Sequence, residues 1–567
     1  MTTSILRINC YINLRPREDR KNITDPQTGH FIPRFKERNL SSMLELELEE
    51  LGSKKYHSIL RKIVRGIEKE SLRISKEGRL SQISHPIALG SALTHTSITT
   101  DYSEALLELI TSPSESIEEC LKSLAEIHDF VYRSIGDEIL WTTSMPCIVD
   151  GEKSIPIAQY GSSNVAQMKT IYRRGLGVRY GRNMQAIAGI HYNFSMPQEF
   201  WEIQWRNTGS EGSLQDYISN RYMGLIRNFH RFSWLLIYLF GASPAVCSTF
   251  LNNLEKHSLQ PFDTKERSYY MPFATALRMG SLGYSSEVQK SMCVSYDSLA
   301  SYLASLRESI VTPHPAYKEY SSGKDGDYQQ LNNCLLQIEN EFYSSIRPKR
   351  LTNSGETPAN ALKRSGIEYI EVRCIDVNPF VPMGIDKNQM LFLDIFLLFC
   401  LISESPLIKS KEQKYLDSNF DTVVNNGRKP NLTLETRSGA KPFCQLASEL
   451  LEEIKPLASL MSNVTNDKEY ISCFNDQVEK IENVERTPSH RMLAEMTNNN
   501  LTFFELALSY SQKWASNSLK NKPSKESFDR LNLESSQSIE VQRKIELQDK
   551  ISFKQYLDNY YAQYNDL

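Results

Sequence analysis

The stretch GIEKESLR, residues 66–73, places two glutamates at alternate positions of a segment whose pattern predicts a β-strand. Successive side chains of an extended strand point to opposite faces, so Glu68 and Glu70 share one face while Ile67 and Lys69 take the other. Two like charges side by side repel each other unless a cation lies between them. The pattern therefore indicates either a solvated strand face or a strand whose carboxylates bind a cation.

Composition excludes several classes of protein. The chain has 567 residues, of which 40% are hydrophobic and 23% are charged, as in globular proteins that bury a large core. Acids and bases are mixed and the formal net charge is -3, which argues against nucleic acid or a membrane as the main partner. The ten cysteines include no CxxC pair, and the N-terminus has no apolar signal segment. These features predict reduced thiols and a cytoplasmic protein.

Two apolar runs deserve comparison with membrane spans. They are FSWLLIYLFGASPAV, residues 232–246, and MLFLDIFLLFCLI, residues 390–402. Both are shorter than the roughly 20 residues that cross a bilayer, and Asp394 interrupts the second. We therefore expect two buried core helices.

The chain reads as one large α+β domain with additions at both ends. Residues 1–42 are polar and lack helical periodicity, so we expect an N-terminal extension that is disordered or not native. No strong linker divides the remainder, which predicts a single domain over residues 43–567. Residues 520–567 are charged and compatible with helix, and predict peripheral C-terminal helices.

A second group of acids occurs in TTDYSEALLELIT. Asp101, Glu104 and Glu108 are spaced i, i+3 and i+7, which predicts one stripe of a helix with Leu106 and Leu109 on the other face. Such a stripe has a structural alternative, because acids in a first helical turn interact favourably with the helix dipole.

Two further strands carry polar residues on one face. In GIEYIEVRCIDVNPF, Glu371 and Arg373 alternate with apolar positions, as a binding pair or a simple salt bridge would. In AIAGIHYNFSMP, His191 and Asn193 point the same way. A histidine in an apolar strand is often a hydrogen-bonded core residue, but beside several carboxylates it is also a suitable metal ligand.

Oxygen-rich clusters of this kind suit magnesium or manganese, which keep open positions for substrate phosphates. The chain has no GxxxxGK[ST] motif, and GLGVRYG, residues 175–181, is too loose to predict a nucleotide-binding loop. Within IRPKR, the side chains of Arg347, Lys349 and Arg350 suit phosphate, although surface charge explains them equally well.

Taken in chain order, several motifs are distinctive: GIEKESLRISKEGRLSQISHPIALGSALTHTSITTDYSEALLELIT, SMPCIV, AQYGSSN, KTIYRRGL, GIHYNFS, YLFGASPAVCSTF, ATALRMGSLGY, LQIENEFYSSIRPKR and GIEYIEVRCIDVNPF. With them the chain resembles the bacterial, proteobacterial-type glutamate-cysteine ligases (γ-glutamylcysteine synthetases). The resemblance begins near Met43 and continues nearly to the C-terminus. It weakens after about Ser403, where TLETRSG is only loosely similar.

The resemblance implies a fold similar to the catalytic half of glutamine synthetase: a curved, mainly antiparallel sheet forming a funnel, with helices outside. It also implies an activity. ATP, L-glutamate and L-cysteine would give γ-glutamylcysteine, ADP and phosphate through a γ-glutamyl phosphate, the first step of glutathione synthesis.

By the same resemblance, two or three Mg²⁺ ions, or Mn²⁺, would bind to residues that the patterns above also single out: Glu68, Glu70, Asp101, Glu108, His191 and Glu371. Arg373 resembles the family arginine that contacts the transferred phosphoryl group, whereas Glu104 is kept as a structural residue. The residues expected to bind glutamate and cysteine are Tyr172, Gln185, Asn193, Arg278 and Tyr284.

The family further implies a monomer, with glutathione as a feedback inhibitor. Two rival hypotheses remain open at this point. An enzyme of the same fold could join glutamate to another amine, and a non-catalytic relative could bind metal without turnover. The second would need a broken ligand set, and every expected ligand is present.

Overall fold

The computed structural model describes residues 40–567 apart from 253–256, 284–286, 291, 293, 325, 354 and 566. The extension expected over residues 1–42 lies outside the described residues, except that its last three residues begin helix α1 (Leu40–Leu51).

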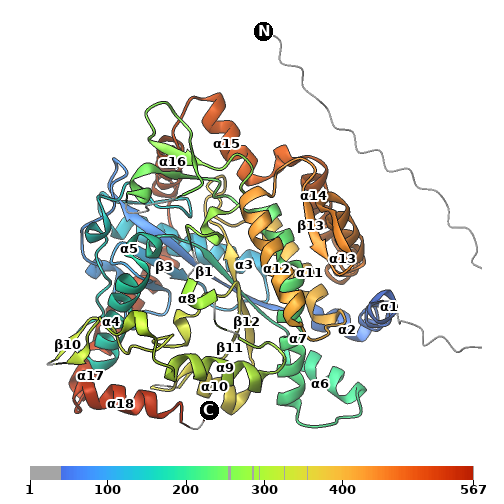
Figure 1. The fold of residues 1–567 in the computed structure, drawn as a ribbon, viewed down its shortest axis with the longest axis horizontal. Helices are drawn as coiled ribbons and strands as arrows, with labels where there is room; N and C mark the ends of the chain where they lie inside the picture. Colours follow the sequence, from blue (N-terminus) through green and yellow to red (C-terminus); the bar gives the residue numbers. More distant parts are fainter. Residues whose placement is uncertain are drawn as a thin grey trace, which may run out of the picture.

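A seven-stranded sheet forms the centre of the molecule (Figure 1). Its strand order is β11-β12-β5-β1-β3-β2, with β4 also pairing with β1, and every pairing is antiparallel. The strands predicted around Glu68, His191 and Glu371 are all present. The members are β1 (Val64–Ile74), β2 (Ile98–Thr100), β3 (Leu106–Ile110), β4 (Ile139–Leu140), β5 (Ile190–Ser195), β11 (Ile346–Lys349) and β12 (Tyr369–Ile375).

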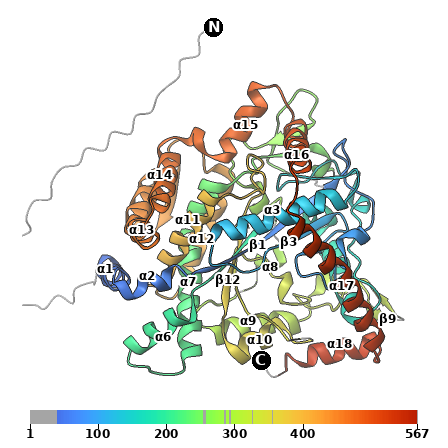
Figure 2. The same cartoon turned by 180° about the vertical axis from the view of Figure 1, so that it is seen from behind.

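Helices cover the apolar face of this sheet. Ile67, Leu107, Tyr192 and Val372 on that face are fully buried. Figure 2 shows α3 crossing in front of β1 and β3 when the molecule is seen from behind. The helices that contact this face are α3 (Ile117–Ser134), α7 (Leu214–Phe240) and α11 (Lys387–Ile402).

Both apolar runs form buried helices, as predicted. The first provides the end of α7 and continues into β6 (Ala245–Cys247), and the second provides most of α11. Across the described part of the chain, no helix combines the length and the apolar character that a membrane span requires.

Asp394, which interrupts the second apolar run, has a buried partner. Its carboxylate pairs with Arg65 of β1, with 2.7 Å between Nη2 and Oδ2. The hydroxyls of Tyr192 and Tyr470 donate to the same carboxylate at 2.7 and 3.0 Å. Because every partner is buried, this cluster ties α11 and α14 (Glu469–Glu482) to the centre of the sheet.

The helix predicted over residues 101–109 is wrong. Residues 98–100 form β2, residues 101–105 form a turn, and residues 106–110 form β3. Pairing with β1 outweighs the helical spacing, because Leu107 and Leu109 then reach the buried face while Glu108 points to the other.

The remaining helices surround the sheet, and the remaining strands form a small three-stranded sheet with β6 and two separate hairpins. Among them, α17 packs against residues 90–97, where Ser538 Oγ accepts a 2.9 Å hydrogen bond from Ser91 N. The helices are α2 (Lys54–Leu60), α4 (Asn164–Tyr180), α5 (Arg182–Gln185), α6 (Gln198–Asn207), α8 (Glu287–Lys290), α9 (Leu299–Val311), α10 (Pro358–Ser365), α12 (Ser410–Asn426), α13 (Phe443–Thr465), α15 (Pro488–Asn498), α16 (Phe503–Lys520), α17 (Lys525–Gln548) and α18 (Phe553–Ala562). The strands are β7 (Gln260–Pro261), β8 (Ser268–Tyr270), β9 (Ser322–Lys324), β10 (Asp327–Tyr328), β13 (Thr433–Thr436) and β14 (Gly439–Pro442).

We predict that Asp394→Leu destabilises the protein by about 3–5 kcal/mol, because it leaves the buried Arg65 guanidinium without its carboxylate. Differential scanning calorimetry should show a fall in melting temperature of several degrees. Asp558→Asn removes an exposed partner of Lys554 and should change the melting temperature little. Equal effects of the two substitutions would contradict a supporting role for the buried pair.

Candidate active site

Strand register gathers polar side chains on the face of the sheet opposite α3. Residues directly opposite each other in antiparallel strands point to the same face. In β1, Glu68 lies opposite His191 of β5, and Glu70 lies opposite Glu108 of β3. Glu371 of β12 lies opposite Asn193 of β5, so one row of functional groups crosses four strands.

Three of these side chains form a group suited to one metal ion. One ligand atom each from Glu68, Glu108 and His191 lie within 4.8 Å of one another. His191 Nδ1 is 3.1 Å from Glu68 Oε2, and Nε2 is 3.7 Å from Glu70 Oε1. Asn193 Nδ2 donates to Glu68 Oε1 at 2.9 Å. The imidazole of His191 therefore lies between the carboxylates of Glu68 and Glu70.

The carboxylates repel each other in the protein alone. Burial, followed by the nearby charges of Glu68 and Asp101, holds the pKa of Glu108 well above its usual range. Burial and Asp101 also raise the pKa of Glu70, whose Oε2 accepts a 2.6 Å hydrogen bond from Gly189 N. A bound cation would relieve this repulsion, so the donor set fits a hard divalent ion.

The other end of the row is cationic. Glu371 Oε1 is 3.1 Å from Lys349 Nζ, and Glu371 Oε2 accepts a 2.9 Å hydrogen bond from Arg373. Burial opposes ionisation of Glu371, but Lys349 and Arg373 hold its pKa well below the usual range. Positive groups beside a carboxylate cluster provide complementary contacts for a phosphate group and the metal ion that accompanies it.

Helix α4 adds basic groups that the sequence patterns did not single out. The Asp101 carbonyl accepts hydrogen bonds from Tyr160 Oη, at 2.9 Å, and from Arg173 Nε. Burial lowers the pKa of Lys169 to about 8, and its ammonium lies 5.1 Å from the centre of the Tyr160 ring. The i, i+4 spacing of Lys169 and Arg173 within KTIYRRGL is the signal that marks them.

The expected glutamate- and cysteine-binding residues lie in several places. Arg278 is buried and donates from Nη2 to the Arg373 carbonyl at 2.9 Å. A Cβ at position 189 would lie 1.9 Å from that same Nη2, so this approach requires glycine. Gln185 Nε2 donates to Tyr343 Oη at 3.0 Å.

Tyr172 of α4 is 9% exposed, and its backbone carbonyl accepts a hydrogen bond from Gln337. Tyr284 lies outside the described residues. Glu104 has the structural contacts of a turn residue, because its carboxylate accepts 2.5 Å hydrogen bonds from the backbone N–H groups of His85 and Gln159.

The three basic residues of IRPKR differ in position. Arg347 and Lys349 lie on the polar face of β11, where Arg347 Nη2 donates to the carbonyls of Asn340 and Phe342. Arg350 follows the strand and donates from Nε to the Gly366 carbonyl at 2.5 Å. Only Lys349 contacts Glu371 among these three.

An antiparallel sheet with an acidic cluster and a cationic edge on one face defines a candidate site for metal-assisted phosphate chemistry. A family profile described as glutamate-cysteine ligase matches residues 48–423. A glutamate-cysteine ligase from Saccharophagus degradans is 44% identical over 508 residues, covering 89% of this chain and 96% of the relative. One from Alcanivorax borkumensis is 46% identical, covering 88% and 95%.

Solved structures agree with these relatives. The crystal structure of glutamate-cysteine ligase from Francisella tularensis in complex with AMP has a TM-score of 0.83 at 35% identity, covering 89% of this chain and 98% of that one. A bifunctional glutathione synthetase from Pasteurella multocida has a TM-score of 0.68 at 22% identity, covering 87% and 58%, and supports the fold alone. The chain belongs to the glutamate-cysteine ligase family, which confirms the resemblance found in its motifs.

We predict that 10 mM MgCl₂ raises the melting temperature of the wild-type protein by at least about 3 °C over an EDTA control, because the ion binds the folded state. Glu108→Gln should lose most of this shift. Without metal it should melt no lower than the wild type, because burial and the neighbouring carboxylates raise the pKa of Glu108 and so disfavour its charged form.

Glu104→Gln is the matched control for that experiment. It should melt lower in both buffers, because one of its two backbone donors loses an acceptor, while the magnesium shift remains. A lower melting temperature for metal-free Glu108→Gln would show that the Glu108 carboxylate is structural instead.

Proposed function

We propose that this chain joins the γ-carboxyl group of L-glutamate to the amino group of L-cysteine, using ATP, and releases γ-glutamylcysteine, ADP and phosphate. The reaction is the first step of glutathione biosynthesis. The observation that carries the proposal is the row of side chains across β3, β1, β5 and β12, which is acidic at one end and basic at the other, in a member of the glutamate-cysteine ligase family.

Two or three Mg²⁺ ions, or Mn²⁺, would be held by the six residues predicted from the sequence: Glu68, Glu70, Asp101, Glu108, His191 and Glu371. The raised pKa of half-buried Glu108 and the 4.8 Å grouping of Glu68, Glu108 and His191 support this assignment. When bound, the ions would neutralise negative charge on the phosphate groups of ATP. Without them, the buried carboxylates would repel the polyphosphate of ATP.

The reaction needs two displacements. A carboxylate is a poor electrophile, so a γ-carboxylate oxygen of glutamate first attacks the γ-phosphorus of ATP, forming γ-glutamyl phosphate and releasing ADP. The cysteine amine then attacks the γ-carbonyl carbon, the carbon–oxygen bond to phosphate breaks, and the amine loses a proton. Both steps bring anions together, so fixed positive charge on the protein lowers the barrier.

Arg373 is the residue that we assign to the transferred phosphoryl group. Its guanidinium hydrogen bonds to Glu371, which holds it at the basic edge of the row, and its side chain is 20% exposed and accessible. A planar guanidinium can hold two phosphoryl oxygens at once, whereas an ammonium presents a point charge. Lys349, on the other side of Glu371, adds a second positive charge.

We further assign substrate recognition to Tyr172, Gln185, Asn193, Arg278 and Tyr284. Asn193 already donates to Glu68, which places its amide beside the metal-binding carboxylates. A small pocket for the cysteine side chain discriminates weakly, so serine, alanine and 2-aminobutyrate should react more slowly than cysteine.

Five broader expectations belong to the same proposal. Residues 43–567 would form one catalytic domain, in which the sheet curves into a funnel like that of glutamine synthetase. The protein would act as a cytoplasmic monomer, and glutathione would inhibit it in competition with glutamate. A lack of competition in steady-state kinetics would count against that inhibition.

The direct test is ADP release by the purified protein with ATP, Mg²⁺ and glutamate, with and without cysteine. We expect cysteine-dependent ADP release and a product with the mass of γ-glutamylcysteine. Faster ADP release with another amine would keep the acyl phosphate but replace the acceptor.

We predict that Arg373→Lys lowers kcat by about 10²- to 10³-fold, the usual effect of removing one preorganised donor at a transition state, because lysine keeps the charge but cannot hold two phosphoryl oxygens at once. Steady-state ADP release measures the change. Arg350→Lys makes the same substitution at the arginine that hydrogen bonds to Gly366, and it should retain kcat within about twofold. Equal losses in the two variants would contradict a role for Arg373 at the phosphoryl group.

A further inference from the structure

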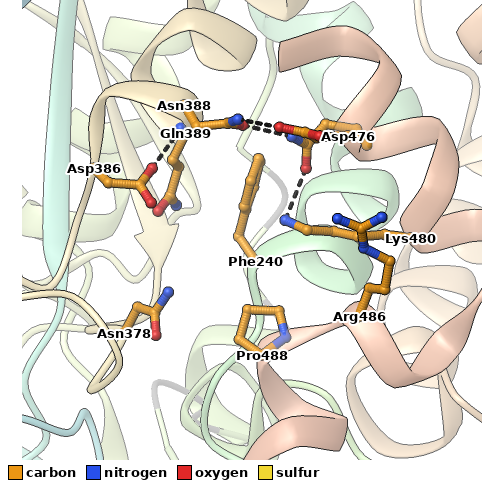
Figure 3. Close-up of a pocket in the computed structure, with 10 residues that line it drawn as sticks. Phe240, Asn378, Asp386, Asn388, Gln389, Asp476, Lys480, Arg486 and Pro488 are labelled. Carbon is orange, nitrogen blue, oxygen red and sulfur yellow. Dashed lines mark hydrogen bonds between the residues drawn. The ribbon is translucent and has the colours of Figure 1, made fainter. Parts of the chain in front are cut away.

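A polar cavity lies apart from the candidate active site, where the end of α7, the start of α11, α14 and the start of α15 meet. Its volume is about 220 Å³. Figure 3 shows Asn378 and Gln389 on one side of the Phe240 ring, and Lys480 and Arg486 on the other. None of the residues assigned above to metal, phosphate or substrates lines this cavity.

Two hydrogen-bond donors in the cavity make no hydrogen bond to a carboxylate within the described part of the chain. Gln389 is 5% exposed, and its Nε2 has no hydrogen-bond partner there. Lys480 donates to two neutral oxygens, Leu239 O at 3.2 Å and Gln477 Oε1 at 2.8 Å. A buried amide N–H₂ without an acceptor is costly, and the carboxylate of a ligand would accept hydrogen bonds from both Gln389 and the half-buried Lys480.

Acidic groups line the same cavity. Asp386 Oδ1 accepts a hydrogen bond from Gln389 N as the N-cap of α11, and Asp476 Oδ2 accepts from Asn388 Nδ2. The second oxygen of each carboxylate makes no hydrogen bond to the described part of the chain. Arg486 is paired with Glu479, so Lys480 shares the cavity with two carboxylates, and this charge suits a zwitterion better than a simple anion.

We propose that this cavity binds a free α-amino acid, with the carboxylate on Lys480 and Gln389 and the ammonium on Asp386 or Asp476. The side-chain amides of Asn378 and Asn388 then face the rest of the ligand. The volume suits one small metabolite and is below the usual range for sites that enclose a larger ligand.

The cavity is linked to the catalytic face by short segments of chain. Two and three residues after Phe240, Ala242 N and Ser243 Oγ donate to Asp376 Oδ2, at 2.8 and 2.6 Å. Asp376 itself comes two residues before Asn378. Arg278 N donates to Ser243 Oγ, and Arg278 Nη2 donates to the Arg373 carbonyl. An occupant that moves Phe240 or Asn378 therefore acts on the support of Arg373, which makes the cavity regulatory.

Equilibrium dialysis with radiolabelled L-glutamine tests the binding step without turnover. L-Glutamine carries the zwitterion and an amide that complements the cavity walls. We expect Lys480→Met and Gln389→Met each to bind one equivalent fewer than the wild type, or that equivalent at least tenfold more weakly. Counting equivalents separates this site from any binding at the catalytic face, so the result does not depend on the proposed reaction.

Lys513→Met is the matched control, because the Lys513 ammonium lies 4.4 Å from the centre of the Trp514 ring, as that of Lys480 lies 4.8 Å from the centre of the Phe240 ring, but Lys513 does not line the cavity. It should bind as the wild type does. Gln389→Met removes a donor that has no partner, so its melting temperature should not fall, which separates lost binding from lost folding. If both cavity variants bind as many equivalents of L-glutamine as the wild type, with unchanged affinity, the cavity is not the binding site. If inorganic phosphate at equal concentration displaces the label, the cavity binds a simple anion and not a zwitterion.

The regulatory step has its own measurement. L-Glutamine should change the rate of ADP release by at least twofold at saturating glutamate in the wild type, and this effect should disappear in Lys480→Met. A response that is the same in both proteins would overturn the link between the cavity and Arg373.

Discussion

Antiparallel pairing of β1 with β3 and β5 is the constraint on which the site depends. It aligns Glu68 with His191 and Glu70 with Glu108, and so forces carboxylates together on one face. That arrangement is unfavourable by itself, as the raised pKa of Glu108 indicates. The opposite face of the same strand adds stabilising contacts, because there Arg65 forms its buried ion pair with Asp394.

The basic edge formed by β11 and β12 gives the row its polarity. Glu371 belongs to both ends of the row, because it shares the face of the acidic cluster yet contacts Lys349 and Arg373. A phosphate group bound there would meet positive charge from the protein, and metal ions would meet negative charge from the cluster. The proposed ligase reaction needs this separation, since it brings a polyphosphate, a carboxylate and an acyl phosphate into one site.

Strand alternation made most of the site predictable. Glu68, Glu70, His191, Asn193, Glu371 and Arg373 each lie in a strand that the sequence pattern indicates, and in each strand the paired residues share a face. The helix predicted around Asp101 failed, because the i, i+3, i+7 spacing of three acids also fits a turn followed by a strand. Only the pairing of β3 with β1 distinguishes the two. Lys169 could be suspected from its spacing with Arg173, but no local signal says that α4 lies beside Asp101.

The sequence by itself determined the family, the strands that carry the carboxylates and the burial of the two apolar runs, because these depend on motifs, on alternation and on hydrophobic content. Tertiary structure alone decided which of these side chains meet, since strand register sets the distances between residues as far apart in the chain as Glu70 and Glu108 or Glu68 and His191. It also decided the partner of Asp394 and the cavity around Gln389. Both arise where helices distant in the chain pack together, and no local pattern encodes that contact.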